Sequence, residues 1–168
     1  MTPLPAALGT GEVVAWRLDP NIFETTWDSG EGSFQAGGRW NSKGVRAVYC
    51  SFDPATTILE VAVHKSFKTL DVVPHILTSL TISDPAAIHV VEPRSVPNPN
   101  WLWPGIPSAG QQTFGDDLLS KYPFLALPSV VSTNSWNLVF VGAVAAARYA
   151  VRTQERFALD PRLHPPHV

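Results

Sequence analysis

The chain has 168 residues, of which 45% are hydrophobic and 15% charged, and its formal net charge is −2 at pH 7. A chain of this size can bury one hydrophobic core, and its near-zero charge lacks the basic surface by which proteins bind nucleic acid. The single cysteine, Cys50, excludes an internal disulfide and a cysteine-based metal site.

The N-terminal residues and the longest apolar run indicate where in the cell the protein is expected. Residues 1–12 are rich in Pro, Ala and Gly and form either an N-terminal arm or a disordered segment, without the regions of a signal peptide. No apolar run approaches the roughly 20 residues of a membrane-spanning helix; the nearest, Leu138–Ala147, is too short. We therefore expect residues 13–168 to form a single cytoplasmic domain that binds neither membrane nor nucleic acid.

The first 67 residues predict a strand, a loop, a second strand and a helix, in that order. Val13–Leu18 and Val45–Ser51 have the β-branched and aromatic composition of strands. Asp28–Gly38 holds four glycines and is expected to be a long loop. Asp53-Pro54 then opens a helix, because Asp is a good N-cap and Pro is tolerated at the first helical position. We expect this helix to end at about residues 65–67.

Two strands are predicted next, at His75–Ile82 and Ala87–Val91. Pro93–Pro107 holds five prolines together with Trp101 and Trp103, which indicates an ordered loop with large aromatic anchors. A helix is predicted after this loop, at Gly110–Lys121.

The last elements are two strands, Phe124–Ser132 and Trp136–Val141, followed by an Ala-rich helix at Gly142–Val151. The chain has 16 prolines, and proline interrupts helices and central strands. The predicted fold class is therefore α+β, with a compact antiparallel-sheet core, short helices and long ordered loops.

A polar stripe marks the helix that follows Asp53. Thr56, Thr57 and His64 lie three or four residues from Glu60, so the helical period places them on one side together with Asp53. The stripe is either a solvated face or the wall of a polar cleft, and the local pattern does not separate the two. In a cleft, Glu60 would be a candidate catalytic carboxylate.

Two arginines are candidates for binding an anion. Gly37 and Gly38 would let the backbone approach a ligand, Arg39 suits a pair of phosphate oxygens, and Trp40 could pack the loop. An ordinary hairpin loop with an exposed Arg is the alternative. Arg17 lies in an apolar strand and should face either an anion or a carboxylate of the protein, because arginine is seldom buried without a partner.

Other chemistry-bearing residues are less distinctive. Tyr49 ends a strand and either stacks on an aromatic ligand or fills the core. Ser129 lacks the Gly-x-Ser-x-Gly motif of hydrolase nucleophiles, which leaves a hydrogen bond to a phosphate or sugar as its candidate role. The five histidines show no metal-ligand spacing, so no metal site is expected.

The order of these residues resembles the RES domain, a family named for an Arg, a Glu and a Ser. The matching motifs are Trp16-Arg17-Leu18, Gly37-Gly38-Arg39-Trp40-Asn41-Ser42, Val48-Tyr49-x-Ser51, Leu59-Glu60-Val61, Leu127-Pro128-Ser129 and Phe157-x-x-Asp160-Pro161-Arg162-Leu163. In detail the chain is most similar to RES toxins that are paired with Xre-type antitoxins. Leu18 is a departure, because many members have Tyr after the first Arg.

The resemblance implies a fold like that of the ADP-ribosyltransferase toxins, with NAD+ as the substrate. It implies a toxin that cleaves the nicotinamide–ribose bond, passes ADP-ribose to a protein, water or phosphate, and is neutralised by a cognate Xre-type antitoxin. A protein acceptor could be an enzyme of nucleotide biosynthesis. By matching position, the implied catalytic residues are Glu60, Arg17 and Tyr49, and the implied NAD+-binding residues are Gly38, Arg39, Trp40, Ser129 and Asn137.

Two other classes of function compete with an NAD+-cleaving enzyme. A non-catalytic nucleotide-binding interaction module would keep the arginines and tolerate loss of Glu60. A toxin ribonuclease is disfavoured by the low basic charge and by the lack of a clearly spaced His/Glu/Arg set. The acceptor of ADP-ribose stays open, because the residues that cleave NAD+ do not encode it.

Overall fold

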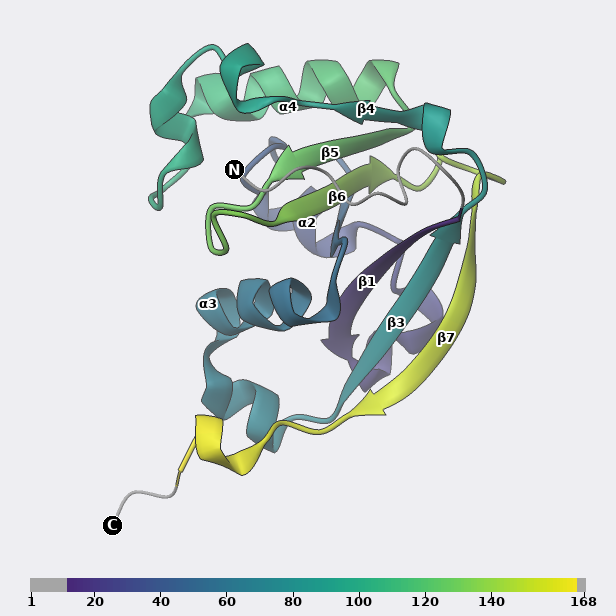
Figure 1. Ribbon diagram of the computed structural model, residues 1–168, viewed down its shortest axis with the longest axis vertical. Coiled ribbons are helices and arrows are strands. Elements are labelled where there is room, and N and C mark those ends of the chain that lie inside the picture. Colours follow the sequence, from purple (N-terminus) through teal and green to yellow (C-terminus); the bar gives the residue numbers. More distant parts are fainter. Residues whose placement is uncertain (1–11, 166–168) are drawn as a thin grey trace.

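The computed structural model describes residues 12–165, which build a seven-stranded sheet in the order β4-β5-β6-β2-β1-β3-β7 (Figure 1). Neighbouring strands are antiparallel except for β4 and β5, which are parallel. Helices pack against this sheet, and the predicted α+β class with an antiparallel core is confirmed. Of the predicted arm, residues 1–11 lie outside the described range.

The bounds of most predicted elements agree with the structure to within a few residues. The strands are β1 (Val13–Pro20), β2 (Ala47–Ser51), β3 (His75–Ile82), β4 (Ile88–Val90), β5 (Phe124–Pro128), β6 (Trp136–Val141) and β7 (Tyr149–Phe157). The α-helices of the described residues are α2 (Glu31–Ala36), α3 (Pro54–Val72) and α4 (Ala109–Lys121). Pro93–Pro107 is an ordered connection that contains two short 3₁₀ helices, at Pro93–Ser95 and Pro99–Leu102.

The Gly-rich segment 28–38 is not wholly a loop, because it contains α2. Gly30 and Gly37 flank this short helix with φ angles of 63° and 74°, a conformation that glycine adopts at little cost. The amide of Gly37 donates to the carbonyl of Ser33 and closes the last turn. Two of the glycines that predicted a loop are therefore the caps of a helix.

The helix predicted at Gly142–Val151 is wrong. The segment forms a turn and then enters β7, which pairs with β3 from Tyr149 to Phe157. The helix propensity of alanine is a few tenths of a kcal/mol per residue and yields to the hydrogen bonds of a complete strand pair. β7 thereby becomes the edge strand of the sheet beside β3.

Helix α3 begins as predicted and ends later than predicted. The Asp53 carboxylate accepts hydrogen bonds from the amide of Thr56 at 2.7 Å and from its hydroxyl at 2.6 Å. Ser66, with φ of 71°, breaks the helix where the sequence predicted its end, and a second helical segment continues to Val72. The hydroxyl of Thr57 donates to the carbonyl of Trp16 at 3.0 Å and docks the start of α3 on β1.

The helices are attached to the sheet by two groups of buried side chains. Trp40, Leu119 and Leu127 belong to the cluster that joins α4 to the β5–β6 end of the sheet. Leu18 and Ala62 belong to the cluster that joins α3 to β1 and β3. Figure 1 shows α4 above β5 and β6, and α3 below them beside β1. Within residues 12–165, no helix has the length and apolar composition to cross a membrane.

We expect Gly115→Ala to destabilise the protein, because a Cβ at Gly115 would overlap the backbone carbonyl of Trp40. Overpacking of this kind typically costs about 1–3 kcal/mol and exceeds the gain in helix propensity. Urea unfolding of both variants against wild type measures the effect. Gly110→Ala, in the same helix, is the control, since its Cβ would lie 3.5 Å from Trp101 in ordinary contact. Equal stability of the two variants would contradict the prediction.

Candidate functional site

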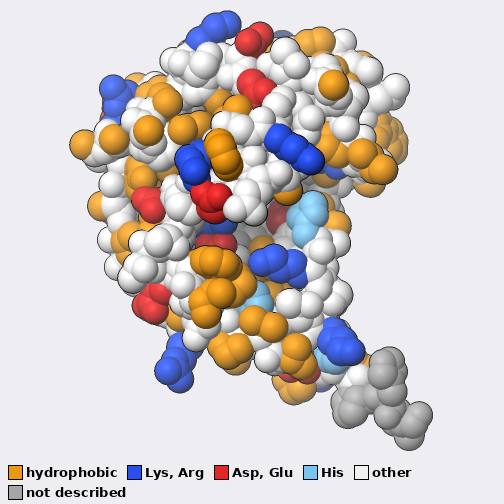
Figure 2. All heavy atoms as spheres, turned by 180° about the vertical axis from the view of Figure 1, so that it is seen from behind, with side chains coloured by type: hydrophobic (Ala, Val, Ile, Leu, Met, Phe, Trp, Pro, Cys, Tyr) orange, Lys and Arg blue, Asp and Glu red, His pale blue; other side chains and the backbone are white. Residues whose placement is uncertain are grey.

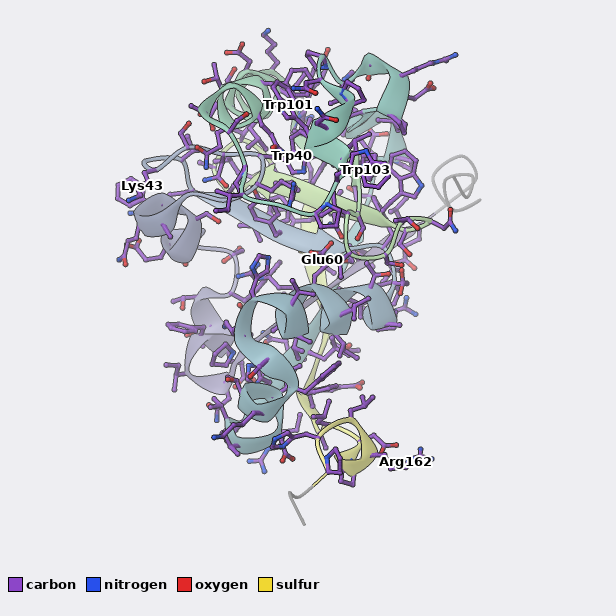
Figure 3. The ribbon with its side chains drawn as sticks, turned by 90° about the vertical axis from the view of Figure 1, so that its left-hand side faces the viewer. Trp40, Lys43, Glu60, Trp101, Trp103 and Arg162 are labelled. Atoms are coloured by element: carbon purple, nitrogen blue, oxygen red, sulfur yellow. The ribbon has the colours of Figure 1, made fainter. Side chains whose placement is uncertain are left out.

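The candidate site is built around the carboxylate of Glu60 on α3. Oε1 accepts a hydrogen bond from the hydroxyl of Ser129 at 2.8 Å and another from Nδ2 of Asn137 at 2.6 Å. No other residue of the described chain donates a hydrogen bond to this carboxylate, and within this range Oε2 has no donor. In Figure 3 Glu60 projects from α3 toward the β5–β6 end of the sheet, and Trp103 lies above Glu60 in this view.

The space around this carboxylate is open to solvent on one side. Glu60 is half-buried, although Thr56 and Thr57 on the same stripe are buried. Figure 2 shows the molecule hollowed at mid-height, where acidic and basic side chains gather. Of the two interpretations of the polar stripe, a face turned toward a polar cleft is the one that the contacts of Glu60 support.

Ser129 is fixed entirely by protein groups. Its side chain is 3% exposed, and its hydroxyl accepts hydrogen bonds from the amides of Val131 at 3.2 Å and Ser132 at 2.9 Å. The hydroxyl proton goes to Glu60. Because a hydroxyl has one proton and two lone pairs, its hydrogen-bonding capacity is filled. In this arrangement Ser129 orients Glu60 and offers nothing to a phosphate or sugar.

Tyr49 supports the loop that carries Arg39. Its hydroxyl donates to Oδ1 of Asn41 at 2.7 Å and accepts from the amide of Trp40 at 3.0 Å. A Cβ at Gly38 would lie 2.6 Å from the same hydroxyl, so this position needs glycine. Asn41 is fully buried and its Nδ2 donates to backbone carbonyls, among them that of Val45 at 3.2 Å. Tyr49 thus lies under the loop and fixes its shape.

Helix α4 holds the other side of this loop. Nε2 of Gln112 donates to the carbonyl of Gly38 at 2.9 Å, and the Asp116 carboxylate accepts from the amide of Ser42 at 3.0 Å. Trp40 is 2% exposed and packs edge-on against Phe114. Its ring therefore anchors the loop in the core and does not face the site.

Arg39 extends from this loop to the Pro- and Trp-rich connection. Its guanidinium donates to the carbonyls of Trp101 at 3.3 Å, Trp103 at 3.4 Å and Gly105 at 2.9 Å. Burial lowers the pKa of Arg39, and the negative charge of Glu60 partly offsets this effect. The charge of Glu60 thus acts on the guanidinium, although no hydrogen bond joins the two groups in the described chain.

Arg17 faces a carboxylate of the protein, which is one of the two partners expected from sequence. Its Nε lies 2.7 Å from Oδ2 of Asp19, and one terminal nitrogen donates to the carbonyl of Tyr49 at 2.8 Å. No contact within residues 12–165 joins Arg17 to Glu60. Arg17 thus connects β1 to the backbone of β2 beneath the site.

The structure brings together Glu60, Ser129 and Asn137 by direct contact, whereas Arg39 and Tyr49 make their hydrogen bonds with other groups of the protein. Sequence reasoning missed Asp19, Gln112 and Asp116 as partners of the site residues, and it gave Asn41 no role. The position of Asn41 close to the Gly-Gly-Arg segment was the one local signal for it in the sequence. No group of three or more His, Cys, Asp or Glu side chains in the described part of the chain is arranged to hold a metal ion.

The similarities of this chain to known proteins include a family, a sequence relative and a solved structure. The RES domain family profile matches residues 14–160 of this chain. A protein of Sphingobium sp. (strain YBL2) named Prs ADP-ribosylating toxin is 28% identical over 156 residues, covering 88% of this chain and 94% of the relative. The crystal structure of the M. tuberculosis MbcT–MbcA toxin–antitoxin complex contains a chain with a TM-score of 0.71 and 18% identity, covering 90% of this chain and 88% of that one. Leu18, the departure noted above, is a core residue with 3% exposure.

A pH dependence of stability follows from the buried phenol of Tyr49. Burial raises the pKa of Tyr49 well above its ordinary value of about 10. Above that pH the unfolded chain loses this proton while the folded protein keeps it, so the free energy of unfolding falls as pH rises. We expect Tyr49→Phe to show a shallower fall between about pH 9 and about pH 11, measured by urea unfolding. Identical slopes in the two proteins would show that Tyr49 does not contribute.

Proposed function

Because the chain belongs to the RES domain family, we propose that it is a toxin that cleaves the nicotinamide–ribose bond of NAD+ and passes ADP-ribose to an acceptor. The observation that carries this proposal is the Glu60 carboxylate, which is held through Oε1 by Ser129 and Asn137, while Oε2 has no donor among the described residues. The name of the Sphingobium relative, an ADP-ribosylating toxin, supports the same reaction class.

The chemistry needs one well-placed carboxylate. Breaking the bond between nicotinamide and ribose leaves an oxocarbenium-like sugar, which a nearby negative charge stabilises. Glu60 would supply that charge, or hold a ribose hydroxyl, through Oε2. Nicotinamide needs no acid to leave, because the electron pair of the broken bond neutralises its positively charged ring. The acceptor then forms a bond to the same carbon and releases its proton.

Arg39 is the residue best placed to bind the pyrophosphate of NAD+. A phosphate carries a full negative charge and can accept two parallel hydrogen bonds from a guanidinium, so it would displace some of the contacts to Trp101, Trp103 and Gly105. We assign Arg17 and Trp40 to fixing the strands and the loop around the ligand, because the side chains of both are used within the protein.

Substitution of Glu60 tests the reaction. Glu60→Gln keeps an oxygen that can accept from Ser129 and Asn137 but removes the charge, so the fold should persist. Nicotinamide release should fall on the order of 10²–10³-fold, as for the loss of one electrostatic stabiliser. His64→Gln, one turn further along the same helix and exposed, should release nicotinamide at the wild-type rate. Wild-type turnover in Glu60→Gln would instead favour the non-catalytic nucleotide-binding module.

The surface near the site offers apolar side chains to a partner. Trp103 is 69% exposed and Ile106 is 98% exposed, and on α3 Leu59 and Val63 are also exposed. Exposed apolar groups that gather near a site mark a binding surface. The structural match to a chain of a toxin–antitoxin complex supports an antitoxin as the occupant. We propose that a cognate Xre-type antitoxin covers the site and presents a carboxylate-bearing segment to Arg39.

Expression in cells tests the toxin and its partner together. The chain expressed alone should arrest growth and deplete cellular NAD+, and co-expression with its antitoxin should restore both. Ile106→Asp should keep NAD+ turnover but weaken the rescue, because a charge on this exposed side chain disrupts an apolar contact with the partner. Harmless accumulation of the soluble chain with unchanged cellular NAD+ would contradict the toxin assignment. Product analysis with water, phosphate or cell extract present identifies the acceptor.

A further inference from the structure

The amide of Asn137 is held at both of its ends. Nδ2 donates to Oε1 of Glu60 at 2.6 Å, and Oδ1 accepts from the hydroxyl of Ser51 at 2.8 Å. The three side chains therefore form a chain of hydrogen bonds from Ser51 through Asn137 to the carboxylate. Ser51 is 2% exposed and has no role in the site as described so far.

The direction of this chain is set by the carboxylate. An ionised carboxylate can only accept hydrogen bonds, so it selects the Nδ2 end of the Asn137 amide. The two ends of a carboxamide have nearly the same shape, and only their partners distinguish them. Once Nδ2 faces Glu60, Oδ1 faces the interior and needs a donor. The hydroxyl of Ser51 has a single proton, and this proton goes to Oδ1.

The backbone places Ser51 at this point. Ser51 and Asn137 are directly opposite each other in the pairing of β2 with β6, and Ser51 is also opposite Trp16 in the pairing of β2 with β1. Side chains of opposed residues lie on the same face of a sheet within contact distance. Ser51 is the last residue of β2, two positions before Asp53, the N-cap of α3. It therefore lies where β1, β2, β6 and α3 converge.

We propose that Ser51 is a positioning residue for NAD+ cleavage, whose hydroxyl fixes the Asn137 carboxamide so that Oε1 of Glu60 stays bound and Oε2 faces the substrate. This inference rests on the proposed function of Glu60. Ser51 touches no ligand itself and acts through Asn137. Without its hydroxyl, Oδ1 of Asn137 is left without a donor, and the orientation of the amide toward Glu60 is less firmly held.

The kinetic consequence is a loss in kcat with little change in KM. We expect Ser51→Ala to lower kcat for nicotinamide release by about 10- to 100-fold, the range for a weakened hydrogen bond to a charged group. In an Asn137→Ala background the same substitution should have no further effect, because the two residues act as one unit. Ser79→Ala is the matched control. Ser79 is also a buried strand serine, and its hydroxyl bonds Thr153 at 2.7 Å on the far side of β1.

A spectroscopic measurement tests the position of the amide without relying on turnover. The side-chain NH₂ signal of Asn137, identified by its absence in Asn137→Ala, should shift in Ser51→Ala and stay unchanged in Ser79→Ala. An unchanged signal in Ser51→Ala, a wild-type kcat, or a full additional loss in the Asn137→Ala background would overturn the proposal. If the wild-type protein releases no nicotinamide, the proposed function fails, and the NMR signal alone then decides whether Ser51 positions the amide.

Discussion

Two hydrogen bonds to a single oxygen atom, Oε1 of Glu60, join segments that are far apart in the chain. Ser129 follows Glu60 by 69 residues and Asn137 by 77. Both donors lie at the β5–β6 end of the sheet, whereas α3 is packed against β1 and β3 through Leu18 and Ala62. The two hydrogen bonds therefore join the part of the molecule that α3 covers to the part that α4 covers. A carboxylate held in this way has a fixed orientation before any ligand arrives, which is what electrostatic stabilisation requires.

The backbone of loop 37–42, which carries Arg39, is also held in a fixed conformation. Tyr49 from the sheet and Asp116 from α4 hold the loop from two sides, and Trp40 anchors it in the core. The guanidinium of Arg39 is thus placed by a rigid support, while its present partners belong to an exposed connection. The site combines a fixed carboxylate with a fixed cation whose contacts can be exchanged.

Local sequence signals predicted most of the fold and part of the site. Strands rich in β-branched and aromatic residues, such as β3 and β6, were found at their full lengths, and the cap formed by Asp53 was found by its residue types. The segment before β7 was wrongly predicted to be a helix because it is rich in alanine. The helix propensity of alanine is weak compared with the pairing of an entire strand with β3. The motif order, not any local pattern, brought Glu60, Ser129 and Asn137 into one hypothesis.

The hydrogen-bond partners of several site residues could not be predicted from the sequence, and the reason is physical. Ser51 and Asp116 acquire their roles from residues 86 and 74 positions away, and nothing in their neighbours encodes those contacts. The polar stripe on α3 had the same ambiguity, since its period fixes which residues share a side but not what that side meets. The contacts of Glu60 with Ser129 and Asn137, which the sequence does not show, favour a cleft wall over a solvated face.

The break in α3 at Ser66 divides the helix into two mechanical units. The first unit, from Pro54, carries Glu60, whereas the second packs Leu70 against Leu159 and pairs Asp71 with His164 near the C-terminal end of the described chain. In a continuous helix the two ends share one axis, so a tilt of one end also moves the other. With a non-helical residue between them, the two segments are joined by the side-chain packing that Ala62 and Leu70 share and not by a common helix axis, so the direction of the Glu60 side chain depends on that packing.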